Sequence, residues 1–246
     1  MRITRKTVTD SDASTRPMSW RPSSIGRIFS HAMNPRRTAM NRIESWSEFY
    51  RERPTIADAV NQVSAHLPLI EQLLRCERIL EIGVGTGSLS GFLGSFVATT
   101  VLESDEKVAR NASQNPLFRN SRVRLVVGDG MRIPFKDSSF DATYSQGLWE
   151  HFPDAEIHRF VREGLRVARV VLASVPTKWY PHLGKMWRPA LRGDERLLGK
   201  EAWQRVLARG GYTAEATYYP DFKLATIGGW TLPWPTHLLV RISRPR

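Results

Sequence analysis

The chain has 246 residues and a formal charge of +12, with 36 Lys and Arg against 24 Asp and Glu. A content of 41% hydrophobic and 24% charged residues is ordinary for a globular protein and excludes wholesale disorder. The single cysteine excludes an intrachain disulfide framework and a multi-cysteine metal site, and no run approaches the ~20 apolar residues of a membrane helix. We therefore expect a cytoplasmic protein with one large domain, no metal and no membrane segment.

The first part of the chain divides into an arm and a helical cap. Residues 1–40 mix Ser, Thr, Arg and Pro with scattered apolar residues, which predicts a basic, disordered arm. Residues 41–76 are predicted to form N-terminal helices that act as a lid. The first helical face runs from Ile43 to Tyr50, and a second helix begins at Pro54 and is ended or kinked by Pro68.

Short apolar runs then alternate with helical patterns. The predicted strands are residues 78–82, 99–102, 123–127, 140–145 and 170–175. A helix with Asp154 as its N-cap is expected between the last two. Because the strands are apolar throughout and the alternation is strict, we expect a parallel sheet covered by helices on both faces, which is a doubly wound α/β fold.

The tail completes this sheet. A helix is predicted over residues 200–209, and two strands over 215–219 and 237–242 are expected to pair antiparallel at the sheet edge. Residues 77–246 are thus predicted to form a single domain with a mostly parallel, seven-stranded Rossmann-like sheet and an antiparallel edge strand. An insertion is expected at about 177–199.

A glycine-rich loop over residues 83–87 follows the first strand, at the place where doubly wound sheets bind ligands. Its spacing departs from the G-x-G-x-x-G dinucleotide fingerprint, because Ser88 stands at the sixth place, and it lacks the lysine of a P-loop. Glu81, just before the glycines, would repel a pyrophosphate and attract an ammonium group. The loop therefore predicts a cationic, non-phosphorylated ligand.

The run Glu81-Ile82-Gly83-Val84-Gly85-Thr86-Gly87 resembles motif I of class I S-adenosylmethionine (SAM)-dependent methyltransferases, of the type 11-like group. Three further segments resemble the later motifs of this family in the right order: 101–105, 128–135 and 138–152. The resemblance implies that Glu103 chelates the ribose hydroxyls. It also implies that Asp129 faces the adenine amino group, with the backbone of Gly130 and Met131 beside the ring.

The resemblance implies SAM as the cofactor. The predicted cofactor-binding residues are Glu81, Gly83, Val84, Gly85, Glu103, Ser104, Asp129, Gly130, Met131 and Gln146. The candidate catalytic residues are Tyr50, Gln146 and His151, of which Tyr50 belongs to the expected lid. For His151 a packing role at a helix start competes with the role of base, and for Asp141 a structural role competes with ligand contact.

The acceptor is less constrained by the sequence. The segment after the fourth strand lacks the N/D-P-P-Y/F motif of methyltransferases that act on adenine or glutamine amino groups. The leading hypothesis is methyl transfer to O, N or C of a small molecule, with specialised metabolism as one setting for it. One alternative is a SAM-consuming cyclase or alkyl transferase that releases methylthioadenosine, similar to azetidine-2-carboxylate synthases. A further alternative is an RNA or protein methyltransferase.

The distribution of charge bears on these alternatives. Residues 54–161 carry 10 Lys and Arg against 13 Asp and Glu, whereas residues 162–246 carry 15 against 6. The cofactor-binding block is thus acidic, as suits a sulfonium and an ammonium, and the acceptor side is basic. We therefore expect a carboxylated or otherwise acidic small-molecule acceptor rather than nucleic acid, and no membrane partner. The sequence does not determine the oligomeric state.

Overall fold

The computed structural model describes residues 45–50, 54–180, 195–219, 226–227, 230–231 and 235–244. The predicted arm at 1–40, the start of the first predicted helix and most of the expected insertion lie outside these residues. No helix within the described ranges is long and apolar enough to cross a membrane.

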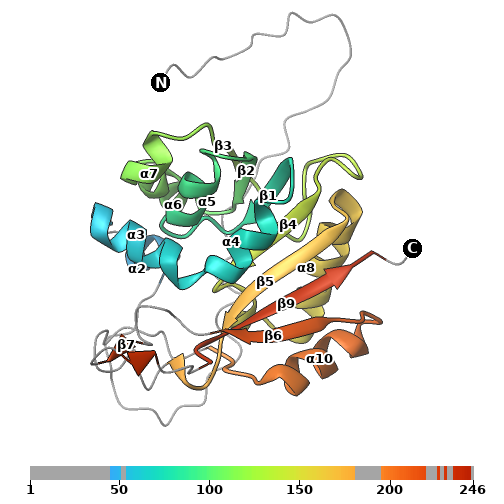
Figure 1. The fold of residues 1–246 in the computed structure, drawn as a ribbon. Helices are drawn as coiled ribbons and strands as arrows, with labels where there is room; N and C mark the ends of the chain where they lie inside the picture. The colour runs from blue at the N-terminus through green and yellow to red at the C-terminus, as the bar shows by residue number, and fades with distance from the viewer. Residues whose placement is uncertain are drawn as a thin grey trace, which may run out of the picture. The chain divides into compact units, whose positions relative to one another are not determined.

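Seven strands form one twisted sheet (Figure 1). They are β1 (Arg78–Ile82), β2 (Ala98–Glu103), β3 (Arg124–Val127), β4 (Ala142–Gln146), β5 (Val170–Pro176), β6 (Glu215–Tyr219) and β9 (His237–Ser243). Their order is β3-β2-β1-β4-β5-β9-β6. The first five strands are parallel, and β9 runs antiparallel between β5 and the outermost strand β6. The predicted doubly wound, seven-stranded sheet is confirmed. A separate two-stranded ladder joins β7 (Thr226–Ile227) to β8 (Trp230–Thr231).

The helices begin and end close to the predicted positions. They are α2 (Trp46–Phe49), α3 (Ile56–Ala65), α4 (Leu67–Leu73), α5 (Ser88–Leu93), α6 (Glu106–Ala112), α7 (Pro116–Arg119), the 3-10 helix η1 (Trp149–His151), α8 (Asp154–Val167) and α10 (Lys200–Arg209). Thr55 and Asp58 form a capping box at the start of α3. The break between α3 and α4 falls at His66, and Pro68 stands in the first turn of α4.

The prediction that Asp154 is an N-cap is wrong. Asp154 is the first residue of α8, and Pro153 occupies the cap position. The carboxylate of Asp154 instead forms ion pairs with Arg196 at 2.6 Å and Arg209 at 3.3 Å. An acidic side chain still suits this position, because the N-terminal end of a helix carries a partial positive charge.

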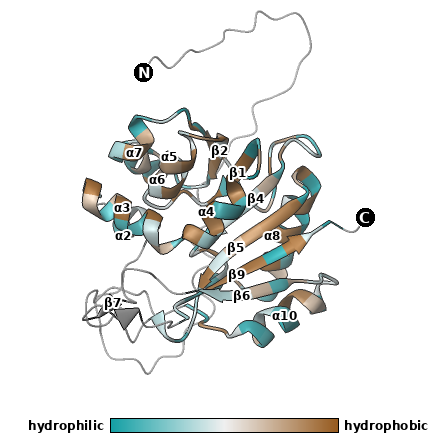
Figure 2. Ribbon diagram, in the orientation of Figure 1, coloured by the Kyte–Doolittle hydropathy of each residue, from teal (hydrophilic) through white to brown (hydrophobic). Residues whose placement is uncertain are grey.

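Hydrophobic clusters lie on both faces of the sheet, and Figure 2 shows that its central strands consist largely of hydrophobic residues. Successive residues of β1 show the alternation: Leu80 packs in the core beneath α8 and α10, and Ile79 packs in the core beneath α3, α4 and α5. Both side chains are fully buried. This double burial is why the strands read as continuous apolar runs.

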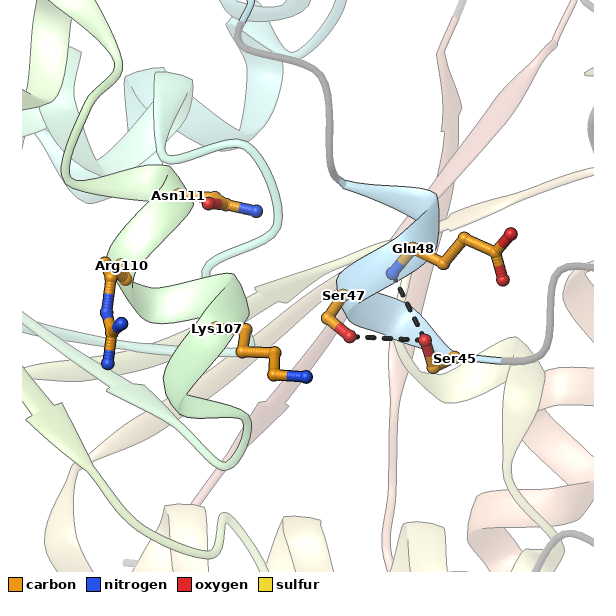
Figure 3. Close-up of a pocket in the computed structure, with 6 residues that line it drawn as sticks. All are labelled: Ser45, Ser47, Glu48, Lys107, Arg110 and Asn111. Carbon is orange, nitrogen blue, oxygen red and sulfur yellow. Dashed lines mark hydrogen bonds between the residues drawn. The ribbon is translucent and has the colours of Figure 1, made fainter.

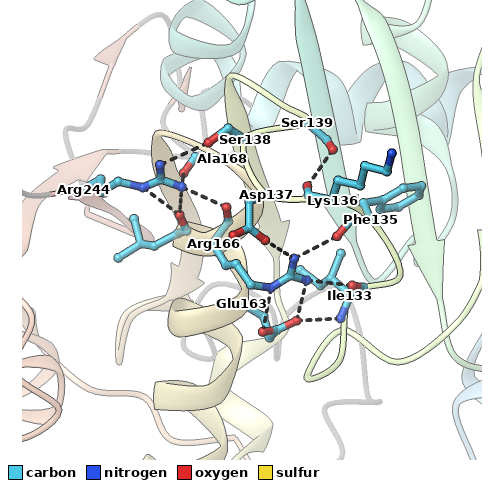
Figure 4. A network of polar contacts seen from close by, with 11 residues as sticks. Ile133, Phe135, Lys136, Asp137, Ser138, Ser139, Glu163, Arg166, Ala168 and Arg244 are labelled. Atoms are coloured by element: carbon cyan, nitrogen blue, oxygen red, sulfur yellow. Dashed lines mark hydrogen bonds and ion pairs between the residues drawn. The ribbon is translucent and has the colours of Figure 1, made fainter.

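An arginine network fixes the segment between β3 and β4 to α8 (Figure 4). Arg166 donates to the carbonyl oxygens of Ile133 and Phe135, each at 2.8 Å. It also forms ion pairs with Asp137 at 2.8 Å and Glu163 at 2.9 Å, and these carboxylates raise the arginine's pKa. The network thereby anchors the part of the β3–β4 connection that follows Asp129, Gly130 and Met131.

The C-terminal end of β9 is tied to the same corner. The Arg244 guanidinium donates to the carbonyl oxygens of Leu165, Arg166 and Ala168, at the end of α8 (Figure 4). These carbonyls have no partner within the helix, so a cationic donor is favourable there.

Candidate functional site

The glycine loop begins at the carboxyl end of β1 and leads into α5. Gly83, Gly85 and Gly87 have φ angles of +82°, +51° and +75°, a region that other residues rarely adopt. At Gly85 a side chain would also meet Tyr50, because a Cβ would lie 3.3 Å from the Tyr50 Oη. The backbone of the loop at Gly85 therefore faces the Tyr50 side chain.

Glu81 lies just before this loop and is almost completely buried. Its side chain is on the α3–α5 face of the sheet, where Tyr144 is its register partner on β4. Burial raises the carboxyl pKa to about 8; the nearby Glu103 adds to the rise, and Ser90 and Tyr144 oppose it. The Oε2 atom of Glu81 has no hydrogen-bond partner among the described residues. A buried carboxyl with an unpartnered oxygen is stabilised by a cationic group.

Glu103 ends β2 and faces the same loop. Its Oε2 accepts from the backbone N–H of Val84 at 3.0 Å, and its Oε1 accepts from the N–H of Asp105 at 2.9 Å. The hydroxyl of Ser104 donates to Oε1 at 3.4 Å. Burial raises the pKa of Glu103, and hydrogen bonds from the backbone N–H groups of Asp105, Val84 and Ser104 oppose the rise. Glu103 therefore connects the glycine loop to the second strand.

The segment after β3 packs against the end of β1. Asp129 Oδ1 accepts from the backbone N–H of Met131 at 2.8 Å, which closes a tight turn. A Cβ on Gly130 would lie 2.5 Å from Ile82 Cγ2, so only glycine allows this close approach. The predicted cofactor residues on β1, β2 and β3 are thus brought to one edge of the sheet, as expected for parallel strands.

Gln146 ends β4 and bonds to a helix that sequence analysis did not connect to the site. Its Oε1 accepts from Gln62 Nε2 of α3 at 3.0 Å, and Gln62 Oε1 accepts from the Thr86 hydroxyl in the glycine loop. No motif marks Gln62, because a polar residue on an amphipathic helix is ordinary. Only the contact of α3 with α5 shows its position.

The lid residues meet above the glycine loop. Trp46 and Tyr50 stack with ring centroids 6.1 Å apart, and the His151 ring meets Trp46 edge-on at 4.8 Å. Asn111 of α6 donates to the Tyr50 carbonyl oxygen at 3.2 Å. The His151 side chain is buried in this aromatic group, with Nε2 3.9 Å from Glu150 Oε1. Tyr50 is therefore part of this aromatic group, and His151 packs against the group through Trp46, with the contacts of a structural residue.

Asp141 is far from this edge. It precedes β4 at the amino end of the sheet, where it accepts from the backbone N–H groups of Glu77 at 3.0 Å and Arg78 at 2.9 Å. It also forms an ion pair with Arg169 at 3.0 Å. These contacts give it a structural role.

A hollow of about 440 Å³ lies beside the lid (Figure 3). It is lined by Ser45, Ser47 and Glu48 of the α2 segment and by Lys107, Arg110 and Asn111 of α6. None of the predicted cofactor or catalytic residues lines it. It therefore borders the outer side of the lid and not the glycine loop.

A second group of buried polar side chains lies further along the carboxyl edge. His66 Nδ1 is hydrogen-bonded to Tyr219 Oη at 2.8 Å, and Ser174 Oγ to the same hydroxyl at 2.5 Å. His237 packs edge-on against His66 at 4.9 Å. Burial lowers the pKa of His66 to about 4 and that of His237 well below its usual range. Both imidazoles are therefore neutral at pH 7. Their sequence neighbourhoods carry no signal for this cluster.

Comparison with known families gives one matching family model. A model described as a methyltransferase domain matches residues 79–170, the region that holds all four motif-like segments.

Curated relatives are methyltransferases. A demethylmenaquinone methyltransferase of Corynebacterium efficiens is 35% identical over 138 residues, which is 51% of this chain and 52% of the relative. A second, from Roseiflexus, is 35% identical over 99 residues, covering 39% and 40% of the two chains. A 27-O-demethylrifamycin SV methyltransferase of Amycolatopsis mediterranei is 26% identical over 122 residues, covering 48% and 44%. The matches span about half the length of these relatives or less.

Solved structures with the same fold include phosphoethanolamine N-methyltransferase 1 of Haemonchus contortus. Its TM-score is 0.62 at 12% identity, with 82% of this chain and 48% of that chain covered. A SAM-dependent methyltransferase from Archaeoglobus fulgidus gives 0.55 at 12% identity, covering 81% and 98%. At these identities the likeness concerns the fold alone.

Proposed function

Because the chain carries a methyltransferase domain and has the fold of class I SAM-dependent methyltransferases, we propose that it transfers a methyl group from SAM to a small-molecule acceptor. The curated relatives act, by their names, on demethylmenaquinone and a rifamycin precursor. By analogy we place this chain in the biosynthesis of a specialised metabolite.

One observation carries the proposal. Glu81 is buried to 2% exposure beside a loop of three glycines with positive φ, and its Oε2 has no partner among the described residues. Ionising a carboxyl at this buried position is costly unless a cation binds beside it, which is why burial raises its pKa. The ammonium of the methionine part of SAM is a cation that fits this position. The residues present therefore fit the cofactor.

The remaining roles follow from position. When bound, SAM supplies a methyl group already activated on a sulfonium. Glu103 lies where it can accept from the ribose hydroxyls, and the turn from Asp129 to Met131 lies where it can contact the adenine. Tyr50 covers Gly85 and excludes water from the loop. With the donor and acceptor held in line, positioning supplies most of the rate enhancement.

The acceptor side is assigned to the end of β4 and to the basic part of the chain. Gln146 and Tyr50 are the residues we place nearest the acceptor, with His151 supporting the lid through Trp46. A general base is needed only where the acceptor is protonated at the working pH. The excess of Lys and Arg after residue 162 suits an acidic or carboxylated acceptor.

Two measurements test the proposal. Isothermal titration calorimetry should show SAM binding, and Glu103→Ala should weaken it at least tenfold. Glu106→Ala, a matched control on the exposed side of α6, should leave it unchanged. Absence of SAM binding by the wild-type protein, or equal binding by the Glu103→Ala variant, contradicts the cofactor assignment.

Mass spectrometry then separates the reactions. Incubation with SAM and a metabolite pool should yield S-adenosylhomocysteine together with a product heavier by one methylene. Methylthioadenosine formed from SAM alone would instead support the cyclase alternative. Methylation of added RNA with a steep salt dependence would support the nucleic-acid alternative.

A further inference from the structure

The orientation of the Gln146 amide is set by a chain of hydrogen bonds that begins at a helix cap. Asn115 is the N-cap of α7, and its Oδ1 accepts from the backbone N–H of Leu117 at 2.9 Å. The other end of the Asn115 side chain is therefore the amino group. It donates to the Thr86 carbonyl oxygen and to Ser88 Oγ, both at 2.9 Å.

The same direction of hydrogen bonding continues through two hydroxyl groups, that of Ser88 at the start of α5 and that of Thr86 in the glycine loop. Ser88 Oγ accepts from Asn115, and the one acceptor for its own proton among the described residues is Thr86 Oγ1, 2.8 Å away, so we assign the proton to that contact. The backbone N–H of Ser88 also donates to Thr86 Oγ1, at 3.3 Å. Both lone pairs of the Thr86 hydroxyl are then used. Its proton is left for Gln62 Oε1, its hydrogen-bond partner on α3.

The same reasoning fixes both glutamines. Since Gln62 accepts through Oε1, its Nε2 is the atom that donates to Gln146 Oε1 at 3.0 Å. The carbonyl oxygen of Gln146 is therefore directed toward Gln62, which uses one of its lone pairs. Its Nε2 has no hydrogen-bond partner among the described residues, and the side chain is only partly buried. In this orientation the Gln146 side chain presents its N–H donors, while its carbonyl oxygen is turned toward Gln62.

The position of this amide is next to the proposed reacting centre. Gln146 ends the strand that neighbours β1, and the N–H of Gly147 donates to the Ser174 carbonyl oxygen of β5 at 2.9 Å. Gln146 therefore lies between the glycine loop and the buried cluster around His66. Because the hydrogen bond from Gln62 of α3 already holds the Gln146 amide in one orientation, the side chain loses little freedom when it binds a ligand.

We propose that Gln146 determines acceptor specificity by donating a hydrogen bond to an oxygen of the acceptor, and that Gln62 is the positioning residue that keeps it in this orientation. The acceptor class is a phenolate, enolate or carboxylate, which offers lone pairs to N–H groups. An amino group would bring its own N–H against those of Gln146, which leaves buried donors unpaired. This inference rests on the proposed methyltransferase function.

A single substitution, Gln62→Glu, should reverse which end of the Gln146 amide faces the acceptor. In Gln62→Glu the carboxylate still accepts from Thr86, but it has no proton to donate to Gln146. The Gln146 amide then turns so that Nε2 donates to the new carboxylate and Oε1 faces outward. Gln62→Met fills a similar volume without either polar atom, so it removes the control of orientation without inverting it. The three proteins form a matched series.

The test uses protein saturated with S-adenosylhomocysteine and two probes of similar shape, 4-nitrophenolate and 4-nitroaniline, titrated by absorbance. Wild-type protein should favour the phenolate about tenfold or more, as expected for one hydrogen bond to a charged group. Gln62→Glu should reverse the preference, and Gln62→Met should reduce it.

Nuclear magnetic resonance of glutamine-labelled protein gives a second readout. The Gln146 side-chain N–H signals should shift on addition of the phenolate in the wild type. In Gln62→Glu they should already be shifted to the hydrogen-bonded position without a probe.

The outcomes separate the two proposals. If the wild-type protein does not bind S-adenosylhomocysteine, the proposed function fails. If it binds the nucleoside but neither probe, or if Gln62→Glu leaves both the preference and the Gln146 signals unchanged, the specificity proposal is overturned.

Discussion

Binding of SAM is expected to release a proton from Glu81, because the buried carboxyl is largely protonated in the free protein. Burial raises the pKa of Glu81 to about 8. At pH 7 a carboxyl with that pKa is ionised in only about one tenth of the molecules. The ammonium of SAM favours the ionised form, so binding should release about 0.9 proton at pH 7 if the pKa falls below about 5 in the complex.

The affinity should follow the same linkage. Between pH 6 and 7 the dissociation constant should fall roughly ninefold, in proportion to the ionised fraction of Glu81. The SAM amino group stays charged in this range, because the pKa of an α-amino group is about 8. Titration calorimetry in two buffers of different ionisation enthalpy measures the proton count directly.

Glu81→Gln is the matched control, since it keeps the shape of the side chain and cannot ionise. Its SAM affinity should be weaker at pH 7 and nearly independent of pH between 6 and 7, with no proton released. The reasoning is refuted if wild-type protein binds SAM with no proton release and a flat pH dependence. It is equally refuted if the Glu81→Gln variant shows the same slope as the wild type.

Other predictions concern stability and the lid. Burial lowers the pKa of His66 to about 4, so the unfolded chain takes up a proton there more readily than the folded protein does. The His66 contribution to the free energy of unfolding is therefore fully present above pH ~6.5 and should fall by about 3 kcal/mol as the pH is lowered to 4. Urea unfolding of wild type against His66→Asn measures this, and equal pH slopes would argue against it. Gly85→Ala should weaken SAM binding at least tenfold, because it strains the φ of +51° and presses on Tyr50; unchanged binding in calorimetry would disprove the close approach. Arg166→Met should lower the free energy of unfolding by about 3 kcal/mol, because Glu163 and the carbonyl oxygens of Ile133 and Phe135 lose their donor. Chemical denaturation measures this loss, and a value under ~1 kcal/mol would contradict an anchoring role.

The sequence predicted the elements well where the signal is local. The strand around Ile79 and Leu80, the glycine loop and the helix at 200–209 were all found from apolar runs, turn residues and helical periodicity. These features depend on neighbours in the chain, so a sequence retains them. The prediction of Asp154 as an N-cap was wrong, because its carboxylate instead pairs with Arg196 and Arg209, which are distant in sequence.

The grouping of Glu81, Glu103 and Asp129 was also predictable, because each lies at or just after the carboxyl end of a parallel strand and such ends meet at one edge. The sequence by itself thus determined the fold class and predicted the edge of the sheet at which we propose that the cofactor binds. Their chemical state was decided by tertiary structure. The raised pKa of Glu81 comes from helices and strands that close over it, and no local pattern measures that burial.

The same limit applies to the acceptor side. Gln62 and Gln146 are 84 residues apart, and their hydrogen bond forms because α3 packs on α5 and thereby brings Gln62 to the end of β4. The cluster of His66 with Tyr219 joins residues 153 apart. Side-chain direction across such distances depends on packing of the whole domain. Sequence therefore predicted the edge of the sheet at which we propose that the chemistry takes place, and only the tertiary structure decided which atoms face that edge.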